Sequence, residues 1–399
     1  MLSQKTIEIV KSTVPVLEKH GKDITTRFYQ LLFTNNPELL NIFNHANQRQ
    51  GRQQTALANA VYAAAANIDN LGAIIPVVKQ IGQKHRALNI LPEHYPIVGE
   101  NLLAAIKDVL GDAATEEIIG AWAEAYGVIA DAFIGVEKEM YKEAKEQPGG
   151  WEGFRSFIVD KKVEESDVIT SFYLKPEDGG AIASYQAGQY LTVKVKPEDQ
   201  ENTHLRHYSL SDAPGKYYYR ISVKREDKGV VSNYLHQTIQ TGDVLLISAP
   251  AGDFVLESNN KPAVLLSGGV GLTPMVSMLN TIVEQQPERE VTFIHGALNS
   301  RVHAMKEHVA QLANEHAKVK SFVAYSEPTE EDRAAKSFDK EGYVDLEWLK
   351  SILPNNQADF YFCGPTPFMK IMYRNLTEWG IPVENIHFEF FGPAAELKE

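Results

Sequence analysis

The spacing of apolar residues changes twice along this chain, and this constrains the possible folds more than any other feature of the sequence. Up to about residue 147, apolar side chains recur every three or four positions, as Val78, Ile81 and Leu88 do. That period predicts α-helices with one buried face. Glycine or proline interrupts the pattern at several places, which divides the region into six or seven helices: Gly21, Pro37, Gly51, 72–76, Pro92 and Gly111.

A linker-like segment at 146–150, which contains Pro148 and two glycines, precedes a change of period from 3.6 to two. Beyond it, Leu191 and Val193 alternate with polar residues, and 219–223 repeats the alternation. Short alternating runs separated by glycine-rich turns are typical of antiparallel sheets. We therefore predict an antiparallel β-barrel over residues 151–261.

The third region begins near residue 262, where short apolar runs alternate with helical patterns. The runs are expected to be buried strands, at 263–266, 291–294, 319–324 and 360–362. Alternation of strand and helix predicts a parallel α/β sheet. At roughly 150 residues per domain, a chain of 399 residues accommodates three domains, with boundaries at 1–147, 151–261 and 262–399.

Charge and cysteine content exclude several classes of protein. Asp and Glu number 52 against 39 Lys and Arg, a net charge of −13 that disfavours nucleic acid as a partner. The single cysteine, Cys363, excludes a disulfide framework and a zinc site built from several thiolates. The sequence shows no apolar run of about 18 residues and no leader-like start, which predicts a cytoplasmic protein without a stable membrane anchor.

A glycine-rich turn follows the first predicted strand of the third region and precedes a helix. It spans 267–274 and contains Gly268, Gly269 and Gly271. Glycines let a backbone approach a pyrophosphate, and a helix N-terminus stabilises its negative charge. Pro274 occupies the place of a third glycine, so this turn alone leaves both nucleotide binding and an ordinary tight turn open.

The barrel region carries a second candidate site at 206–209. Arg206 has the geometry to pair with a pyrophosphate, Tyr208 to stack on a flat ring, and Ser209 to hydrogen-bond a ring nitrogen. By itself this run is also compatible with the polar end of a strand.

The order of these motifs resembles the ferredoxin–NADP reductase family: an RxYS strand, the run 229–232, the glycine turn, and then Cys363, Gly364 and Pro365. The resemblance implies FAD on the barrel and a nicotinamide nucleotide on the α/β domain. It assigns contacts with FAD to Tyr190, Arg206, His207, Tyr208, Ser209 and Ser232. It places the nucleotide near Gly268, Gly269, Val270, Gly271, Leu272, Thr273, Cys363 and Gly364.

The chain ends in an unusually aromatic run, 388–393, which a core strand would also explain. In the resembling family an aromatic residue near the end covers the face of the flavin. We expect Phe391 in that role and Glu389 near the ring, within a cofactor-binding run of Glu389, Phe390, Phe391, Gly392 and Pro393.

A flavin reductase needs an electron acceptor, and the helical region is the candidate. His85 continues the apolar stripe of Val78, so we expect it to face the interior as an iron ligand, although such a histidine is otherwise an ordinary core residue. Glu137 follows Phe133 by four positions, so we expect it to point inward, although a solvated helix face is the ordinary alternative for such a residue. Its carboxylate and the phenol of Tyr95 are expected to hydrogen-bond the other ring nitrogen of His85, which makes the ligand more electron-rich.

Other residues are expected on the opposite wall of a haem pocket. Phe43, at the end of a short helix over 37–43, is placed to pack on a porphyrin. Tyr29 is expected to donate a hydrogen bond to the ligand on iron. Gln53, which begins a helix, and Leu57 on the same helix close the pocket. Lys84 is expected at the domain junction, where it would tune the haem potential.

The order and spacing of Phe43, Gln53 and His85 resemble those of a globin, and a globin followed by this reductase module is the flavohaemoglobin architecture. The resemblance covers nearly the whole chain, including Gln53 where a storage globin has a distal histidine. It implies haem b, FAD and NADH or NADPH as cofactors. It also implies nitric oxide dioxygenase activity, in which the coenzyme reduces FAD, FAD reduces haem, and O2 on ferrous haem converts nitric oxide to nitrate.

Three other functions remain open at the level of sequence. They are a sensor or store of O2 or nitric oxide, a reductase of a separate protein that docks on the helical domain, and a haem–flavin reductase of alkyl hydroperoxides or quinones. The choice between NADH and NADPH depends on 295–301, where Ser300 or Arg301 would meet a 2′-phosphate. Three self-contained domains predict a monomer. A large apolar haem pocket has room for a lipid, although no residue pattern identifies one.

Overall fold

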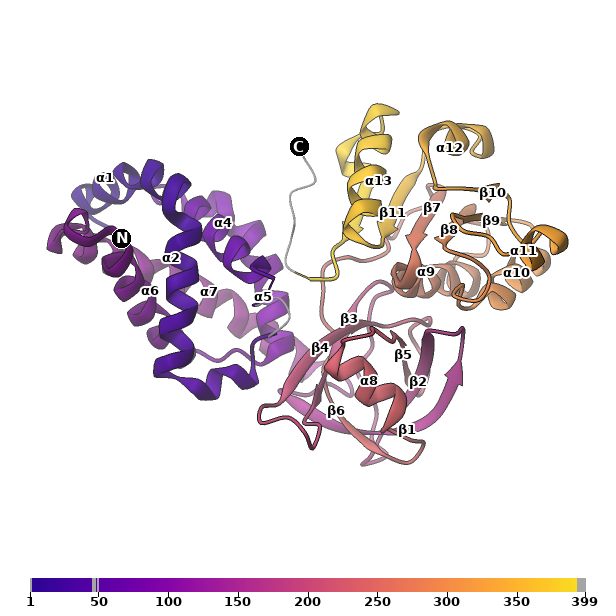
Figure 1. The fold of residues 1–399 in the computed structure, drawn as a ribbon, viewed down its shortest axis with the longest axis horizontal. Coiled ribbons are helices and arrows are strands. Elements are labelled where there is room, and N and C mark those ends of the chain that lie inside the picture. The colour runs from indigo at the N-terminus through magenta and orange to yellow at the C-terminus, as the bar shows by residue number, and fades with distance from the viewer. Residues whose placement is uncertain (1, 45–47, 49, 393–399) are drawn as a thin grey trace. The chain divides into compact units, whose positions relative to one another are not determined.

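The computed structural model describes residues 2–44, 48 and 50–392. Pro393, which the family resemblance assigns to the cofactor-binding run, lies outside the described residues. The chain divides into two compact units (Figure 1). The first comprises Met1–Gln147, Trp151–Phe154 and Lys194–Arg206, and the second comprises Pro148–Gly150, Arg155–Val193 and His207–Glu399.

The first unit contains the helices that the 3.6-residue period predicts (Figure 1). They are α1 (Gln4–Ser12), α2 (Val14–Asn35), η1 (Pro37–Asn41), α4 (Arg52–Ala66), η2 (Leu71–Ile74), α5 (Ile75–Leu88), α6 (His94–Leu110), η3 (Gly111–Ala113) and α7 (Glu116–Glu146), where η marks a 3₁₀ helix. Hydroxyl groups cap two of them. The Ser3 side chain accepts from the backbone N–H of Thr6 at 3.0 Å, and the Thr115 side chain accepts from that of Ile118 at 3.3 Å.

The core of this unit is made of apolar side chains from several helices, among them Val10, Phe28, Ala65, Leu102 and Trp122. Two local predictions were wrong. Gly21, expected to break a helix, lies inside α2 and faces Ala58 of α4. A Cβ at position 21 would lie 3.5 Å from the Cβ of Ala58. Gly21 marks a contact between helices and not a turn. The short helix predicted over 37–43 ends at Asn41, so Phe43 follows it.

By length and composition alone, α7 is apolar enough to cross a membrane. This is weak evidence, because the core helices of globular proteins pass the same test. In this unit α7 packs against α1, α5 and α6 and contributes Trp122 and Ala125 to the core.

The antiparallel barrel that the sequence predicts is present. Its strands are β1 (Phe154–Glu164), β2 (Ile169–Pro176), β3 (Tyr190–Val195), β4 (His204–Ser209), β5 (Tyr219–Lys224) and β6 (Val244–Ser248), in the order β4-β3-β6-β1-β2-β5. A bridge between Leu210 and Ile221 joins the two ends of this order and closes the barrel. One helix, α8 (Val230–Gln237), lies between β5 and β6.

Burial in the barrel alternates less than the sequence predicts. Thr192 in β3 and Ser222 in β5 are buried, although they fall on the polar phase of their strands. Each has a hydrogen-bond partner, since Thr192 Oγ1 lies 2.8 Å from Nδ1 of His207 and Ser222 Oγ lies 2.8 Å from Oγ of Ser171. Both faces of these strands are covered, and small polar residues are tolerated there because they are paired.

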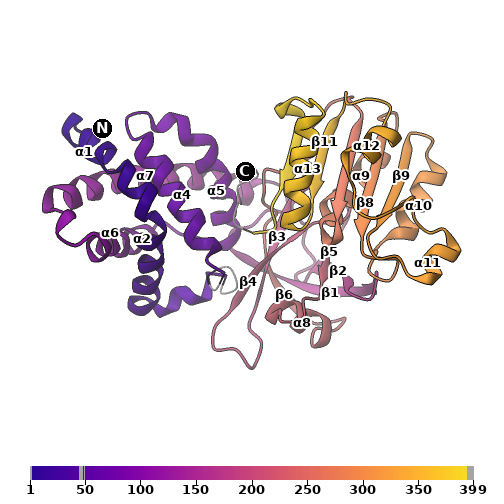
Figure 2. The ribbon, with the colours of Figure 1, turned by 45° about the horizontal axis from the view of Figure 1, so that its top comes forward.

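The α/β sheet is parallel, as predicted (Figure 2). Its strands are β7 (Ala263–Gly268), β8 (Val291–Ala297), β9 (Val319–Tyr325), β10 (Lys340–Glu341), β11 (Asp359–Cys363) and β12 (Ile386–Glu389), in the order β10-β9-β8-β7-β11-β12. The connecting helices are η4 (Gly269–Gly271), α9 (Leu272–Gln285), α10 (Lys306–Glu315), α11 (Glu330–Ala335), α12 (Leu346–Ile352), α13 (Thr366–Glu378) and η5 (Val383–Asn385). Helices α9 and α10 pack on one face, and α12 and α13 pack on the other.

The barrel and the parallel sheet share an apolar core within the second unit. Ala187 and Phe254, both from the barrel, belong to the same buried cluster as Met275 and Met278 of α9. Burial of apolar surface therefore holds these two parts together, in addition to the chain that links them.

Helices α6 and α7 cross at Gly99, where a Cβ would lie 2.5 Å from Cε1 of Tyr126. We expect Gly99→Ala to lower the free energy of unfolding of the helical unit by about 1–3 kcal/mol, because the ring must move. Gly127→Ala on α7 is the matched control, since among the described residues no atom lies within 4 Å of its Cβ. Urea unfolding followed by far-ultraviolet circular dichroism measures both variants. Equal urea midpoints for the two variants would contradict a close contact between Gly99 and Tyr126.

Candidate functional site

Three polar side chains, one each from α5, α6 and α7, meet in the helical unit. Nδ1 of His85 lies 2.7 Å from Oε1 of Glu137 and 3.2 Å from the hydroxyl oxygen of Tyr95. The Tyr95 hydroxyl donates to the same carboxylate oxygen at 2.7 Å. Glu137 is only 2% exposed, and a carboxylate at that depth is stable only when it accepts hydrogen bonds. The structure thus brings together the predicted iron ligand and its two predicted supporting groups.

This arrangement decides which nitrogen of His85 is available to a ligand. A carboxylate can only accept, so the network assigns a hydrogen to Nδ1, which donates it to Glu137. Nε2 then carries a lone pair, and among the described residues it has no hydrogen-bond partner; the side chain is 31% exposed. Burial, followed by the hydrogen bond and charge of Glu137, raises the pKa of Tyr95, so the phenol remains a donor. An imidazole held in this way is an electron-rich metal ligand.

Sequence reasoning missed the aromatic residues that support this cluster. Tyr126 donates its hydroxyl to the backbone carbonyl of Tyr95 at 2.6 Å, and Tyr141 donates to that of Ile90 at 2.7 Å. The ring of Phe133 lies 6.3 Å from that of Tyr95. Tyr126, Phe133 and Tyr141 recur on one face of α7 together with Glu137, and that periodicity was the signal available in the sequence.

A second polar group, the phenol of Tyr29 on α2, is buried among apolar side chains. The side chains of Gln53 and Gln48 lie near its hydroxyl. Burial raises the pKa of Tyr29, and the two glutamines oppose that shift without cancelling it, so the phenol is neutral. The sequence predicts Tyr29 and Gln53 together. It carries no periodic signal around Gln48, which sequence reasoning missed.

Apolar side chains surround Tyr29. The ring of Phe43 lies 5.7 Å from that of Tyr29 and 5.4 Å from that of Phe33. Leu57 on α4 packs against the same core, and both Phe43 and Leu57 are half-buried. Lys84 is half-buried beside His85 on α5, and its influence on a haem potential stays a prediction.

These residues fit a haem. An iron porphyrin needs an axial nitrogen and apolar contacts for its ring. His85 offers Nε2, with its other nitrogen already held by Glu137. Phe43 and Leu57 present partly accessible apolar surface, and Tyr29 offers a neutral donor.

All but one of the residues predicted to hold FAD lie on two neighbouring strands, and Ser232 lies on α8. Because side chains alternate along β4, Arg206 and Tyr208 point to one side and His207 and Ser209 to the other. Ser209 is buried, and the ring of Tyr190 on β3 lies 4.8 Å from that of His207. The strands therefore bring Tyr190 beside His207, with Arg206 and Tyr208 on the other side of β4, while the contacts of all these residues with a flavin stay predictions.

Ser232 lies in the first turn of α8, after the N-cap residue Gly229. Its hydroxyl oxygen accepts from the backbone N–H of Glu226 at 3.1 Å, and the helix N-terminus suits a phosphate. At the other end of α8, Nζ of Lys162 donates to the backbone carbonyls of Leu235, His236 and Ile239 at 3.3, 3.2 and 2.5 Å. Lys162, which sequence reasoning missed, stabilises the negative end of the same helix.

The glycine turn and the Cys363–Gly364 turn are in direct contact. A Cβ on Gly271 would lie 2.1 Å from the carbonyl oxygen of Cys363, and a Cβ on Gly364 would lie 2.6 Å from the ring of Phe368. Only glycine fits positions so close to other atoms. The two turns follow β7 and β11, the adjacent strands where the order of the sheet reverses, and ligands of such sheets bind beside that point.

Cys363 itself is fully buried, and its thiol donates to the backbone carbonyl of Glu389 at 3.3 Å. Burial, followed by the Glu389 carboxylate, raises the pKa of the thiol, so it is not a reactive thiolate. Strand β12 ends at Glu389, in register with Cys363, and the chain continues through half-buried Phe390 to Phe391, which is 43% exposed, and Gly392. Contacts of this run with a flavin stay predictions.

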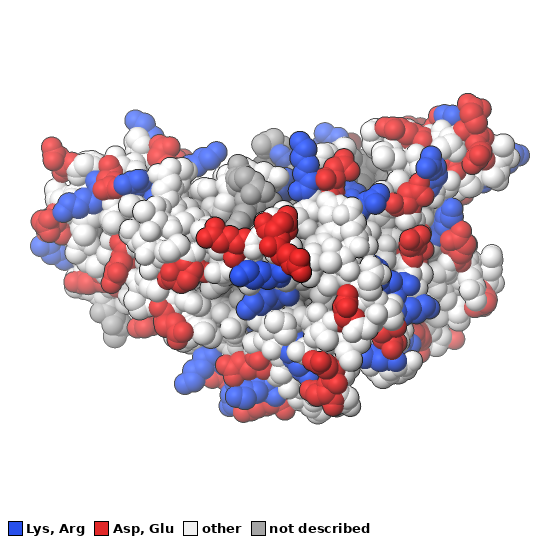
Figure 3. Space-filling model, turned by 60° about the horizontal axis from the view of Figure 1, so that its bottom comes forward, with Lys and Arg blue, Asp and Glu red and all other residues white. Residues whose placement is uncertain are grey.

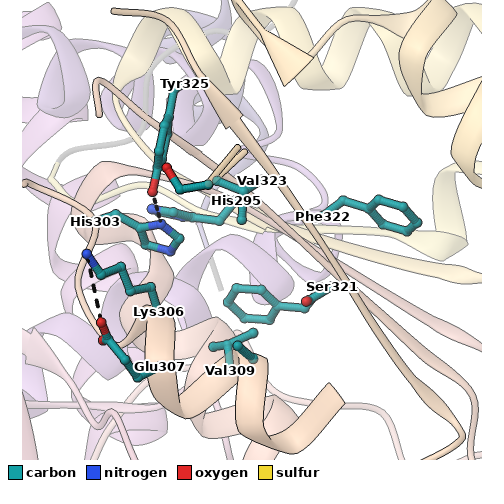
Figure 4. Close-up of a pocket in the computed structure, with 12 residues that line it drawn as sticks. His295, His303, Lys306, Glu307, Val309, Ser321, Phe322, Val323 and Tyr325 are labelled. Atoms are coloured by element: carbon teal, nitrogen blue, oxygen red, sulfur yellow. Dashed lines mark hydrogen bonds and ion pairs between the residues drawn. The ribbon is translucent and has the colours of Figure 1, made fainter. Parts of the chain in front are cut away.

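A cavity of about 300 Å³ lies beside α10 against β8 and β9 (Figure 4). His295 and His303 line it; their rings are 4.5 Å apart, and Nδ1 of His303 lies 2.9 Å from the hydroxyl oxygen of Tyr325. The cavity borders the segment in which the sequence predicts contacts with the coenzyme ribose. Arg301, one candidate for a 2′-phosphate, is ion-paired with Asp167 at 2.9 Å.

Three family models match the chain in the order of these structural parts. Residues 26–133 match a globin model, residues 156–256 an oxidoreductase FAD-binding domain, and residues 265–374 an oxidoreductase NAD-binding domain. Flavohemoproteins of Bacillus thuringiensis subsp. konkukian and Bacillus subtilis are 63% and 58% identical to it, and each alignment covers 100% of both chains. The chain belongs to the flavohaemoprotein family.

Solved structures agree with this membership. A flavohemoglobin from Malassezia yamatoensis with bound FAD and heme superposes with a TM-score of 0.86 at 28% identity, covering 98% of this chain and 100% of that one. The FAD/NAD-binding domain of a nitric oxide dioxygenase from Vibrio cholerae matches with a TM-score of 0.55 at 39% identity, covering 60% and 99%. The predicted fold class, the flavohaemoglobin resemblance and the cofactor set of haem, FAD and NAD are confirmed. The flavohaemoprotein is a haem and flavin oxidoreductase.

The buried histidine of the nucleotide-binding part predicts a pH dependence of stability. Burial, and secondarily Lys306, lowers the pKa of His303 to about 4, below the 6.5 of a free imidazole. Protons therefore bind the unfolded chain first as the pH falls, and the free energy of unfolding drops between about pH 6.5 and 4, by up to about 3 kcal/mol for this residue. His303→Gln should reduce the loss seen in urea unfolding between pH 7 and 5. If His303→Gln loses as much free energy of unfolding between pH 7 and 5 as the parent, His303 is not the source of the pH dependence.

Proposed function

We propose that this flavohaemoprotein is a nitric oxide dioxygenase, which uses O2 and a nicotinamide coenzyme to convert nitric oxide to nitrate. Nitric oxide, O2 and one electron together make nitrate, so one two-electron coenzyme serves two molecules of nitric oxide. The observation that carries the proposal is the His85–Glu137–Tyr95 cluster in a globin that is joined to FAD-binding and NAD-binding domains.

When bound, haem b supplies a redox-active iron for O2 and nitric oxide, and FAD turns a two-electron donor into a source of single electrons. The chain's own residues set the conditions for that chemistry. His85 would hold the iron through Nε2, while Glu137 accepts the Nδ1 hydrogen at 2.7 Å and makes the imidazole a stronger electron donor. Tyr95 donates to the carboxylate and keeps it in place.

Tyr29 is the donor for O2 held in the pocket. Its raised pKa keeps the phenol neutral, so its hydroxyl hydrogen is available to a ligand beside Gln53 and Gln48. Phe43 and Leu57 keep the surroundings apolar, so that the one hydrogen bond acts in a medium of low dielectric.

The second unit provides the electrons. Tyr190 and the strand 206–209 bind the flavin, with the α8 N-terminus and Ser232 near its phosphates. The turn 268–273, with Cys363 and Gly364 beside it, binds the coenzyme, and the run 389–392 lies at the flavin. We further propose domain boundaries at 1–147, 151–261 and 262–399.

We propose that the protein works as a cytoplasmic monomer on small molecules. Figure 3 shows Lys and Arg interspersed with Asp and Glu over the face that it presents, without the broad basic surface that nucleic acid requires. The proposal also allows a lipid to bind in the haem pocket, where it would contact the apolar surface of Phe43 and Leu57.

Tyr29→Phe tests the reaction. With NADH in air, we expect nitric oxide consumption to fall by about tenfold to a hundredfold, because the pocket loses its donor, while the rate of flavin reduction stays the same. Tyr62→Phe, on the exposed side of α4, is the matched control and should consume nitric oxide at the parental rate. A parental protein that reduces hydroperoxides or quinones but consumes no nitric oxide would overturn the proposal, as would full activity in Tyr29→Phe.

His85→Ala tests the iron ligand. The variant should lose the haem absorption band and retain its flavin, because His85 lies on helix α5 and the proposed flavin residues lie on the barrel. His20→Ala, an accessible histidine on α2, should leave the absorption spectrum unaltered. A normal haem band in His85→Ala would exclude this histidine as the ligand.

A further inference from the structure

A buried hydrogen-bond cluster centred on Asp212 joins the end of the flavin strand to helix α9. Oδ1 of Asp212 accepts from Nδ2 of Asn280 at 2.8 Å, and its backbone carbonyl accepts from the Ser277 hydroxyl at 2.6 Å. Asp212 follows Ser209 of β4 by three positions, and Ser277 and Asn280 are one and two turns beyond Thr273 at the start of α9. One cluster therefore contacts both segments that carry cofactor-binding residues.

The Asp212 carboxylate has a complete set of partners. Tyr218 donates to Oδ2 at 2.8 Å, the backbone N–H of Ala213 donates to Oδ1 at 2.8 Å, and the Arg220 guanidinium lies 3.7 Å from Oδ2. Burial raises the pKa of Asp212, but Arg220 and the donated hydrogen bonds outweigh it and hold the pKa below its ordinary value. The carboxylate stays charged, and a buried charge strongly penalises loss of any partner.

Asn280 has one favourable orientation in this cluster. His308 on α10 donates from Nε2 to Oδ1 of Asn280 at 2.7 Å, which directs the amide N–H toward Asp212. Ser277, Asn280 and Glu284 lie on one face of α9, and Lys216 contacts Glu284 at 2.7 Å. The segment from Asp212 to Lys216 thus follows this face of the helix.

We propose that Asp212, Asn280 and Ser277 are positioning residues for hydride transfer from the coenzyme to the flavin. They tie the backbone of the flavin strand to the helix that begins at the dinucleotide turn, and so set the distance between the two rings. In this step the C4–H bond of the nicotinamide breaks, the hydride passes with two electrons to N5 of the flavin, and oxidised coenzyme remains. A misplacement of about 1 Å lowers the rate of such a step by up to about a hundredfold.

The proposal depends on the FAD-binding and NAD-binding domains and is independent of the reaction at the haem. If nitric oxide is not the substrate, reduction of the flavin by the coenzyme can still be measured. The two proposals therefore fail separately.

Asn280→Ala in the full-length protein is the test. On anaerobic rapid mixing with NADH, we expect the limiting rate of flavin reduction to fall about tenfold or more, with less than about a threefold change in the apparent Kd of the coenzyme. Coenzyme deuterated at C4 checks that hydride transfer is the step observed. In protein freed of FAD and haem, amide hydrogen exchange over 210–213 and 275–281 should become faster.

Asn259→Ala is the matched control. Nδ2 of Asn259 donates to the buried Asp359 carboxylate at 2.7 Å, which is the same kind of bond. Asp359 begins β11, so this bond lies at the N-terminal end of the strand, and the turns lie at the C-terminal ends. Its limiting rate should stay within about twofold of the parent. An unchanged rate in Asn280→Ala, or an equal loss in both variants, overturns the proposal. If Asn280→Ala does not fold, Ser277→Ala replaces it, with an expected loss of at least about threefold.

Discussion

The buried carboxylate of Glu137 constrains how the helical unit packs. Removing such a charge from water costs several kcal/mol unless donors replace the water. Its two donors, His85 and Tyr95, come from different helices, so the carboxylate is satisfied only when α5, α6 and α7 are packed together. The hydrogen bond that satisfies Glu137 also assigns the hydrogen to Nδ1 of His85 and leaves the lone pair of Nε2 for the proposed iron ligation. Stability and ligand chemistry in this unit thus depend on the same contact.

The buried carboxylate of Asp212 constrains packing in the second unit in the same way. It is 7% exposed and is satisfied only by groups from both the barrel and the nucleotide-binding part, including Tyr218 and Asn280. Apolar burial holds these two parts together but is not directional. Hydrogen bonds to a buried charge are directional, and they select one arrangement out of those that the apolar core would tolerate.

Two buried tyrosines, Tyr29 and Tyr95, have different roles because their neighbouring side chains differ. Burial raises the pKa of both Tyr29 and Tyr95, so both are neutral donors. Tyr95 donates to a carboxylate and is committed to holding it. The contacts of Tyr29 with the neutral amides of Gln53 and Gln48 act on its oxygen, since they lower its pKa, and this leaves the hydroxyl hydrogen for a ligand.

Periodicity along the chain was sufficient for the three architectures, because the spacing of buried positions is a local property of helices and strands. It also placed His85 and Glu137 on inner faces, and composition marked the turn at 268–271. Glycine was ambiguous, since Gly21 lies inside a helix where a Cβ would make ordinary contact, whereas Gly271 makes room for the Cys363 carbonyl. The partners of Tyr29, Lys162 and Asp212 came only from the folded structure. Gln48, the carbonyls at the end of α8, and Asn280 are brought to them by packing between elements, which no local pattern records.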